Sequence, residues 1–152
     1  MDEKEFFMRE ALLLAEEAAG LGEVPVGALI VKDGEITGRG RNRTVETKNP
    51  LAHAEMEAMA DALSKRRGFR LTECEMYVTL EPCAMCAGAI VHSRLARVYI
   101  GAPDIKTGAC GSVMNILADK HLNHHPEVIT GILEDECSFI LKNFFGDLRR
   151  NR

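Results

Sequence analysis

Residues 76–86 read Met-Tyr-Val-Thr-Leu-Glu-Pro-Cys-Ala-Met-Cys, and this segment decides the type of fold. Its first half, up to Leu80, is apolar, which predicts a short buried strand. Pro82 suits the first turn of a helix, where its missing N–H costs nothing, and we expect this helix to reach about His92. A buried strand that leads directly into a helix indicates an α/β protein.

The rest of the chain shows the same alternation of strand and helix. Asp33-Gly34 is a strong signal for a hairpin turn between two strands, and apolar positions at helical spacing predict the helices. The expected elements are a helix at 3–19, strands at 24–31 and 35–40, a polar loop at 42–50, a helix at 52–67, strands at 98–101 and 128–133, a loop at 102–112, a short helix at 113–118 and a last helix at 135–150. This order predicts a layered α/β sheet with one antiparallel hairpin at its edge.

Length and composition suit one globular domain that comprises residues 1–152. Apolar residues make up 46% of the chain, but no apolar run reaches the roughly 18 residues that span a bilayer. The acidic, polar start of the chain is unlike a secretory signal, so we expect a cytoplasmic protein with no membrane partner. In that reducing compartment, five cysteines indicate metal binding or catalysis rather than disulfides.

The charge distribution leaves the partner open. A net charge of −4 argues mildly against a nucleic-acid partner, because phosphate binding draws on lysine and arginine. Basic residues nevertheless cluster at 39–43, 65–70 and 149–152. Taken singly, each cluster suits a solvated surface, and overall charge does not determine local charge.

His53, Cys83 and Cys86 are the candidate metal ligands. Two cysteines three residues apart share one face of a helix, and thiolate and imidazole are the usual ligands of zinc. Three protein ligands are typical of catalytic zinc, which keeps its fourth position for water. Both ligand groups are expected near helix N-termini, where the helix dipole favours thiolate over thiol.

Glu55 is the candidate acid–base residue. Zinc makes hydroxide available at neutral pH. A hydrolysis that expels an amine from a ring also needs a proton carried from the water to the ring and then to the leaving amine. A carboxylate beside the metal can do both. Glu55 and His53 would face apart inside a regular helix, so they can share one site only at a helix start, which Pro50 upstream suggests.

Together these residues match the pattern H-x-E followed by P-C-x-x-C, which is typical of zinc nucleobase deaminases. Each part is weak alone. The structural alternatives are a site without metal or a closed zinc site, which would need a fourth ligand. Candidates for that ligand are Cys74, Cys110 and His92.

The sequence resembles the bacterial tRNA-specific adenosine deaminases, within the cytidine deaminase-like superfamily. The resemblance covers nearly the whole chain. The metal motif marks the superfamily, whereas the glycine-rich stretch at 101–112 and the Phe-Phe pair near the end resemble this branch. The matching segments are 23–28 (Glu-Val-Pro-Val-Gly-Ala), 42–43, 52–55, 77–83, 85–89, 92–94, 101–102, Asp104, 106–109, 111–112, 131–133 and 144–145.

The resemblance implies an activity, a fold and a set of roles. It implies a homodimer that converts adenosine to inosine at the wobble position of a tRNA anticodon stem-loop, with one zinc per subunit. The implied fold is a three-layer α/β/α sandwich with a five-stranded mixed sheet. The implied roles are zinc binding for His53, Cys83 and Cys86, proton transfer for Glu55, a hydrogen bond to the flipped adenine for Asn42, walls of the base pocket for Val26 and Leu80, a contact to the target sugar for Asp104, and packing near the anticodon loop for Phe145.

The substrate residues also have simpler interpretations. Asn42 in a polar loop is ordinarily a turn residue, Asp104 could be a turn or cap residue, and Phe145 could fill a core. The histidines at 121, 124 and 125 look like a metal cluster, but the resemblance assigns them no zinc, so we interpret them as loop residues.

Three rival functions follow from the same residues. The first is a deaminase of free bases or nucleosides, which the acidic net charge would suit. The second is a zinc-stabilised RNA-binding protein without catalysis, in which Glu55 would have no use. The third is a dithiol redox protein built on Cys83 and Cys86, which would leave His53 unexplained.

Overall fold

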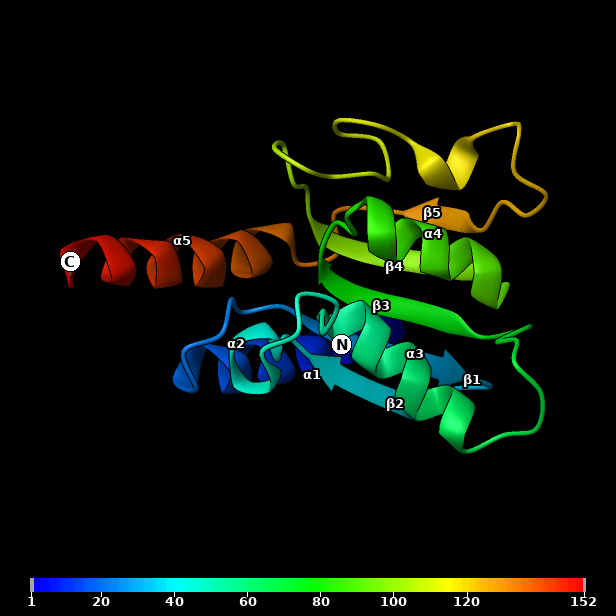
Figure 1. Ribbon diagram of the computed structural model, residues 1–152, viewed down its shortest axis with the longest axis horizontal. Helices are drawn as coiled ribbons and strands as arrows, with labels where there is room; N and C mark the ends of the chain where they lie inside the picture. The colour runs from blue at the N-terminus through cyan, green and yellow to red at the C-terminus, as the bar shows by residue number, and fades with distance from the viewer. Residues whose placement is uncertain (1, 152) are drawn as a thin grey trace.

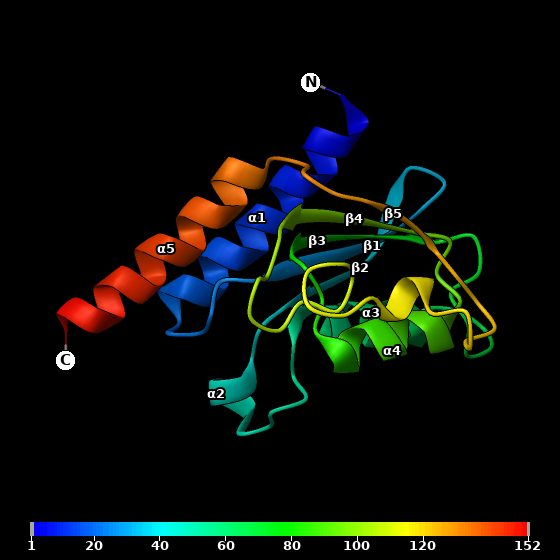
Figure 2. The same ribbon diagram turned by 90° about the horizontal axis from the view of Figure 1, so that it is seen from above.

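In the computed structural model, which describes residues 2–151, five strands form one mixed sheet between two layers of helices (Figures 1 and 2). The predicted three-layer α/β/α sandwich with a five-stranded sheet is confirmed. In chain order the elements are α1 (Glu3–Gly20), β1 (Gly27–Lys32), β2 (Glu35–Arg41), α2 (Thr44–Thr47), α3 (Ala54–Ser64), β3 (Glu75–Leu80), α4 (Ala84–Ser93), β4 (Arg97–Ala102), the 3₁₀ helix η1 (Ile116–Ala118), β5 (Glu127–Ile129) and α5 (Glu134–Arg150).

The sheet has the order β2-β1-β3-β4-β5. The β1–β2 hairpin is antiparallel and turns at Asp33 and Gly34, whose φ angles of 51° and 78° suit the expected tight hairpin turn. β1 also pairs antiparallel with β3, whereas β3, β4 and β5 run parallel. The hairpin therefore lies at one edge of the sheet, as predicted.

Alternation along the strands divides the core into two halves. On β1, Ala28 and Ile30 pack with α3 and α4, whereas Leu29 and Val31 face the opposite way and pack with α1. α1 and α5 cover that second face together (Figure 2). Because successive strand residues point to opposite faces, one buried strand supplies side chains to both halves of the core.

Some predicted boundaries are wrong. β1 begins at Gly27 rather than at 24, and the helix expected at 52–67 spans only Ala54–Ser64. Pro82 lies outside α4, which starts at Ala84 with Cys83 as its N-cap. The predicted helix at 113–118 is a short 3₁₀ helix at its end, and β5 stops at Ile129.

The loop expected at 42–50 contains a short helix, α2. Its start is held by the buried carboxylate of Glu23, which accepts hydrogen bonds from the backbone N–H groups of Val45 (3.0 Å) and Glu46 (2.7 Å). A carboxylate distant in sequence thus takes the part of an N-cap, which local sequence patterns could not reveal. Within residues 2–151, none of the helices combines the length and apolar character needed to cross a membrane.

Candidate metal centre and active site

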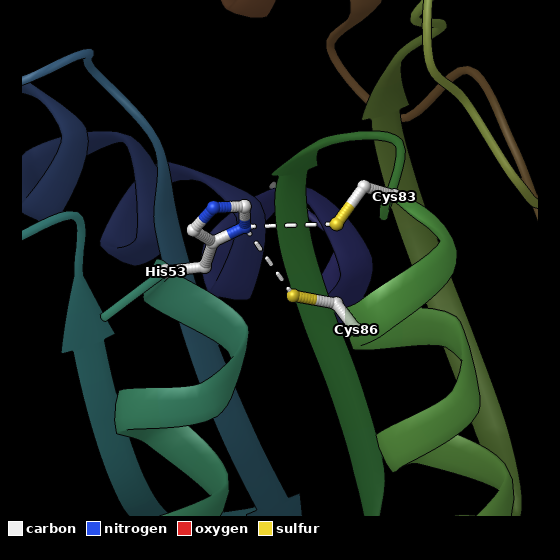
Figure 3. A group of neighbouring side chains, drawn as sticks. All are labelled: His53, Cys83 and Cys86. Atoms are coloured by element: carbon white, nitrogen blue, oxygen red, sulfur yellow. Dashed lines mark hydrogen bonds between the residues drawn. The ribbon is translucent and has the colours of Figure 1, made fainter. Parts of the chain in front are cut away.

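Two helix starts bring the predicted metal ligands together. His53 precedes α3 as its N-cap residue, and Cys83 precedes α4 in the same way, both with extended backbone. Cys86 lies in the first turn of α4, three residues after Cys83, so the two sulfur atoms share one side of that turn. α3 and α4 start at the same end of the sheet, and His53 therefore faces both cysteines (Figure 3).

The distances among the three ligand atoms fit zinc. His53 Nδ1 lies 3.7 Å from Cys83 Sγ and 3.5 Å from Cys86 Sγ, and all three atoms lie within 4.8 Å of one another. Tetrahedral zinc, with Zn–N of about 2.0 Å and Zn–S of about 2.3 Å, places nitrogen and sulfur about 3.5 Å apart. The side chains are thus already spaced as the metal requires, and they match zinc in donor type.

The charge state of the thiols also suits a metal. Hydrogen bonds from the Cys86 thiol and from His53 lower the pKa of Cys83 to about 3. The pKa of Cys86 is raised, because its thiol donates to Cys83 and is buried. The pKa of His53 is raised by its hydrogen bond to Cys83. The site therefore holds a thiolate near neutral pH before any cation is added, and thiolate is the form that binds metal.

The other candidate ligands do not belong to this group. Over residues 2–151, His53, Cys83 and Cys86 are the one group of histidine, cysteine or carboxylate side chains with metal-binding spacing. Cys74 contacts Arg66 Nη1 (3.0 Å), Cys110 Sγ lies 3.9 Å from the carbonyl oxygen of Pro82, and His92 is likewise outside the group. Three ligands without a fourth are typical of catalytic rather than structural zinc, which argues against the closed-site alternative.

Glu55 lies in the first turn of α3, two residues after His53. Its side chain is only 4% exposed, and this burial raises the pKa of Glu55 to about 7. A carboxyl group with a pKa near neutrality can both accept and return a proton at physiological pH. The helix start allows the two residues to approach the same site, because His53 is still extended while Glu55 is helical.

The edge strand fixes where α3 begins. A Cβ on Gly40 of β2 would collide with the backbone oxygen of Ala54 and the backbone nitrogen of Ala58, so only glycine lets the helix approach this closely. Asn42, just beyond β2, accepts a hydrogen bond from the Ala54 N–H through its Oδ1 (2.9 Å). Asn42 therefore caps the turn that carries Glu55, at the residue that follows His53.

The two expected wall residues, Val26 and Leu80, come from the segments that carry β1 and β3. Val26 precedes β1 and is buried at 5% exposure, and its carbonyl oxygen accepts the N–H of Asn42 at 3.2 Å. Leu80 ends β3, three residues before Cys83, and is half-buried. Leu80 is close in the chain to Cys83, Val26 is joined to Asn42 by that hydrogen bond, and both side chains pack against the core.

Asp104 and Phe145 lie on more distant segments. Asp104 Oδ1 accepts hydrogen bonds from the N–H groups of Lys106 (3.0 Å) and Thr107 (3.1 Å). Its carboxylate thus stabilises its own turn, which agrees with the interpretation of Asp104 as a turn residue. Phe145 on α5 is 40% exposed and lines a hollow of about 330 Å³ together with Lys106, Leu141, Lys142 and Arg149. Neither residue belongs to the metal centre itself.

Sequence reasoning gave no role to two buried carboxylates, Glu23 and Glu81. Glu23 is 1% exposed and holds α2, and Glu81 is 5% exposed and holds the 104–112 loop. An acidic residue directly next to a buried apolar segment was the available signal in both cases. The histidines at 121 and 125 do not form a metal group; they bond to Asp119 through its Oδ1 (2.9 Å) and its backbone oxygen (2.7 Å).

Comparisons with known proteins agree with this geometry. The model of the cytidine and deoxycytidylate deaminase zinc-binding region matches residues 1–102, which include all three ligands. The tRNA-specific adenosine deaminase of Bacillus subtilis (strain 168) is 43% identical over 152 residues, covering 100% of this chain and 94% of that protein.

Solved structures give the same result in three dimensions. A structure from studies of A-to-I editing by tRNA:A34 deaminases at the wobble position of transfer RNA is 41% identical, covers 90% of this chain and 99% of its own, and has a TM-score of 0.87. Guanine deaminase from Bacillus subtilis is 39% identical but covers only 65% of this chain and 64% of its own, with a TM-score of 0.62. The chain therefore belongs to the tRNA-specific adenosine deaminases, within the family that carries the cytidine and deoxycytidylate deaminase zinc-binding region.

Proposed function

We propose that this protein hydrolyses adenosine to inosine at the wobble position of a tRNA anticodon loop. The observation that carries the proposal is the buried carboxyl group of Glu55 beside a three-ligand site of His53, Cys83 and Cys86. A structural zinc site has no use for such a group, and a dithiol redox site has no use for His53. Family membership adds the substrate class.

Zinc held by the three ligands supplies a Lewis acid that makes a hydroxide nucleophile available at neutral pH. Glu55 is the residue that transfers protons. Its carboxylate takes the proton of the attacking water, delivers it to the purine ring, and then transfers a proton to the amine that leaves as ammonia. Burial at 4% exposure keeps bulk water from competing for that proton.

Asn42 orients the base in this proposal. Its Oδ1 is already engaged with the Ala54 N–H, so its amide NH₂ is the group that faces substrate as a donor. A purine ring nitrogen is a suitable acceptor. Val26 and Leu80 supply the apolar walls of the base pocket. Flipping a base out of a loop costs less free energy than flipping one out of a duplex, which favours a loop substrate.

In this proposal, α5 and the 104–112 loop contact the part of the RNA that lies outside the target nucleotide. Phe145 is an exposed aromatic ring in a hollow that Lys106, Lys142 and Arg149 make basic. Aromatic rings stack on bases and cationic side chains pair with phosphates, so this hollow suits an anticodon loop despite the net charge of −4. Asp104 would contact the target sugar from the same loop.

We further propose that residues 1–152 form one deaminase domain, that two copies associate as a homodimer, and that the protein works in the cytoplasm. Light scattering of the purified protein tests the association. A mass about twice 16.8 kDa is expected, and a mass of one chain would refute the dimer.

The deciding experiment uses an RNA stem-loop with adenosine at the wobble position. The purified zinc-loaded protein is incubated with it, the RNA is digested, and inosine is measured by mass spectrometry. Inosine formation that is lost in Glu55→Gln supports the proposal. Free guanine, adenosine and cytidine are assayed in parallel, and turnover of one of these without inosine in the RNA would place the protein among the small-molecule deaminases.

A further inference from the structure

Glu81 is a buried acidic residue that the deamination chemistry leaves without a role. It follows β3 directly and precedes Pro82 and Cys83, and its side chain is 5% exposed. Within residues 2–151, no lysine, arginine or histidine forms an ion pair with it. A buried carboxylate without a cation must be stabilised by hydrogen bonds.

Those hydrogen bonds all come from one loop, residues 104–112. Glu81 Oε1 accepts the backbone N–H of Asp104 (3.0 Å) and the hydroxyl of Ser112 (2.5 Å). Oε2 accepts the backbone N–H groups of Cys110 (2.9 Å) and Ser112 (3.1 Å). Four donors occupy the two oxygens, so this carboxylate is engaged in binding the loop rather than free to transfer a proton.

The loop is built to approach this carboxylate closely. A Cβ on Gly108 would lie 2.5 Å from the Oε2 of Glu81, so only glycine fits there. The Ala109 N–H donates to the carbonyl oxygen of Pro82 at 2.9 Å, which ties the same loop to the residue before the ligand Cys83. The loop is thereby fixed to the metal centre through Glu81 and Pro82.

We propose that Glu81 is a positioning residue that holds the 104–112 loop as a preformed wall of the nucleotide site and so sets the affinity for RNA. This inference rests on the proposed function, because the loop carries Asp104 and Lys106, which face the RNA in that proposal. Glu81 acts through the loop and leaves the reacting atoms to Glu55.

A preformed wall has a distinct kinetic consequence. If the loop loses its anchor, only a fraction of the free protein has the binding-competent loop, and apparent affinity falls by that fraction. Once RNA is bound, the loop is ordered and the chemistry is unchanged. The variant should therefore raise KM and keep kcat, whereas a merely structural residue would lower the active fraction and leave KM unchanged.

The test compares Glu81→Gln with Glu75→Gln in the zinc-loaded protein. Glutamine keeps the size of the side chain but turns a donor toward N–H groups. Glu75 is a matched control at the other end of β3, where its Oε2 accepts hydrogen bonds from Arg97 (2.9 Å) and from the Tyr99 hydroxyl (3.2 Å). Steady-state deamination of the stem-loop, zinc content and amide hydrogen exchange are measured for both.

We expect Glu81→Gln to raise KM about tenfold with kcat and zinc content unchanged, and to speed exchange at the amides of Cys110 and Ser112. Glu75→Gln should do neither. Ser112→Ala, which removes one donor, should raise KM about threefold and serves if Glu81→Gln does not fold. A fall in kcat at constant KM, or unchanged exchange in the loop, would overturn the proposal. A wild-type protein inactive on the stem-loop would instead refute the proposed function, and the exchange data would still test the anchor.

Discussion

Replacement of Glu55 by glutamine separates the chemistry of the site from its stability. The substitution keeps the volume of a side chain that is 4% exposed and changes none of the three metal ligands. It removes the proton carrier, so the rate should fall roughly a hundredfold to ten-thousandfold, which is about 3 to 5 kcal/mol of transition-state stabilisation. Zinc content should remain one per chain.

The same variant should stabilise the metal-free protein. Burial raises the pKa of Glu55 from 4.5 to about 7. Below pH 4.5 the carboxyl is protonated in both the folded and unfolded chains, so its ionisation does not change the free energy of unfolding. Between 4.5 and 7 the unfolded chain loses its proton first, so the free energy of unfolding falls as pH rises; above 7 the whole penalty applies. The difference between these two pKa values corresponds to at most about 3 kcal/mol of unfolding free energy.

The assay combines urea unfolding of the metal-free protein at pH 4 and pH 8 with activity and zinc analysis of the loaded protein. Glu55→Gln should be more stable than the wild type at pH 8 and equal to it at pH 4. Glu57→Gln, on the same helix and half-buried, serves as control and should keep full activity. Full activity of Glu55→Gln would refute the proton-transfer role, and equal stability at pH 8 would refute the argument from burial.

Three further predictions concern the frame of the site. Cys86→Ala should bind less than one zinc per chain, as measured by metal analysis. It should also lose the increase in melting temperature that zinc gives the wild type. A full zinc complement in this variant would show that the ligands are misassigned. Gly40→Ala should destabilise the protein by about 1 to 3 kcal/mol in urea unfolding, because its Cβ collides with the start of α3, and an unchanged midpoint would contradict that close approach. Burial of Glu81 opposes its charge, but hydrogen bonds from Ser112 and from the backbone of the loop outweigh burial and lower the pKa of Glu81. The ionised group therefore stabilises the fold above about pH 4.5, and this contribution to stability disappears as pH falls through the lowered pKa. Acid unfolding should therefore be shallower in Glu81→Gln, and an identical acid profile would count against the hydrogen-bonded carboxylate.

Much of the fold followed from local patterns in the sequence. The hairpin at Asp33 and Gly34 was predictable because only a few residue pairs adopt the two positive φ angles of such a turn. The alternation of apolar strands and helices predicted the layered sheet. Element ends were less accurate, since the start of α3 depends on contact with Gly40 and Asn42 rather than on its own residues.

The chemical identity of the metal site was also contained in the sequence, whereas its surroundings were not. Spacing and residue type are local properties, and they sufficed to select His53, Cys83 and Cys86 as candidate ligands, which the fold brings together. Asn42 could be a turn residue or a substrate contact, and the fold shows that its oxygen caps α3 beside the metal centre. That role depends on β2 and α3 packing together.

The sequence by itself determined which atoms can bind zinc and which strands and helices carry them. The tertiary structure decided how those elements are held: Glu23 binds the start of α2, and Glu81 binds the 104–112 loop. Each carboxylate bonds to backbone N–H groups more than 20 residues away along the chain. No local pattern specifies such pairs, because every residue except proline carries the same backbone donor and only folding selects which of them meet a buried charge.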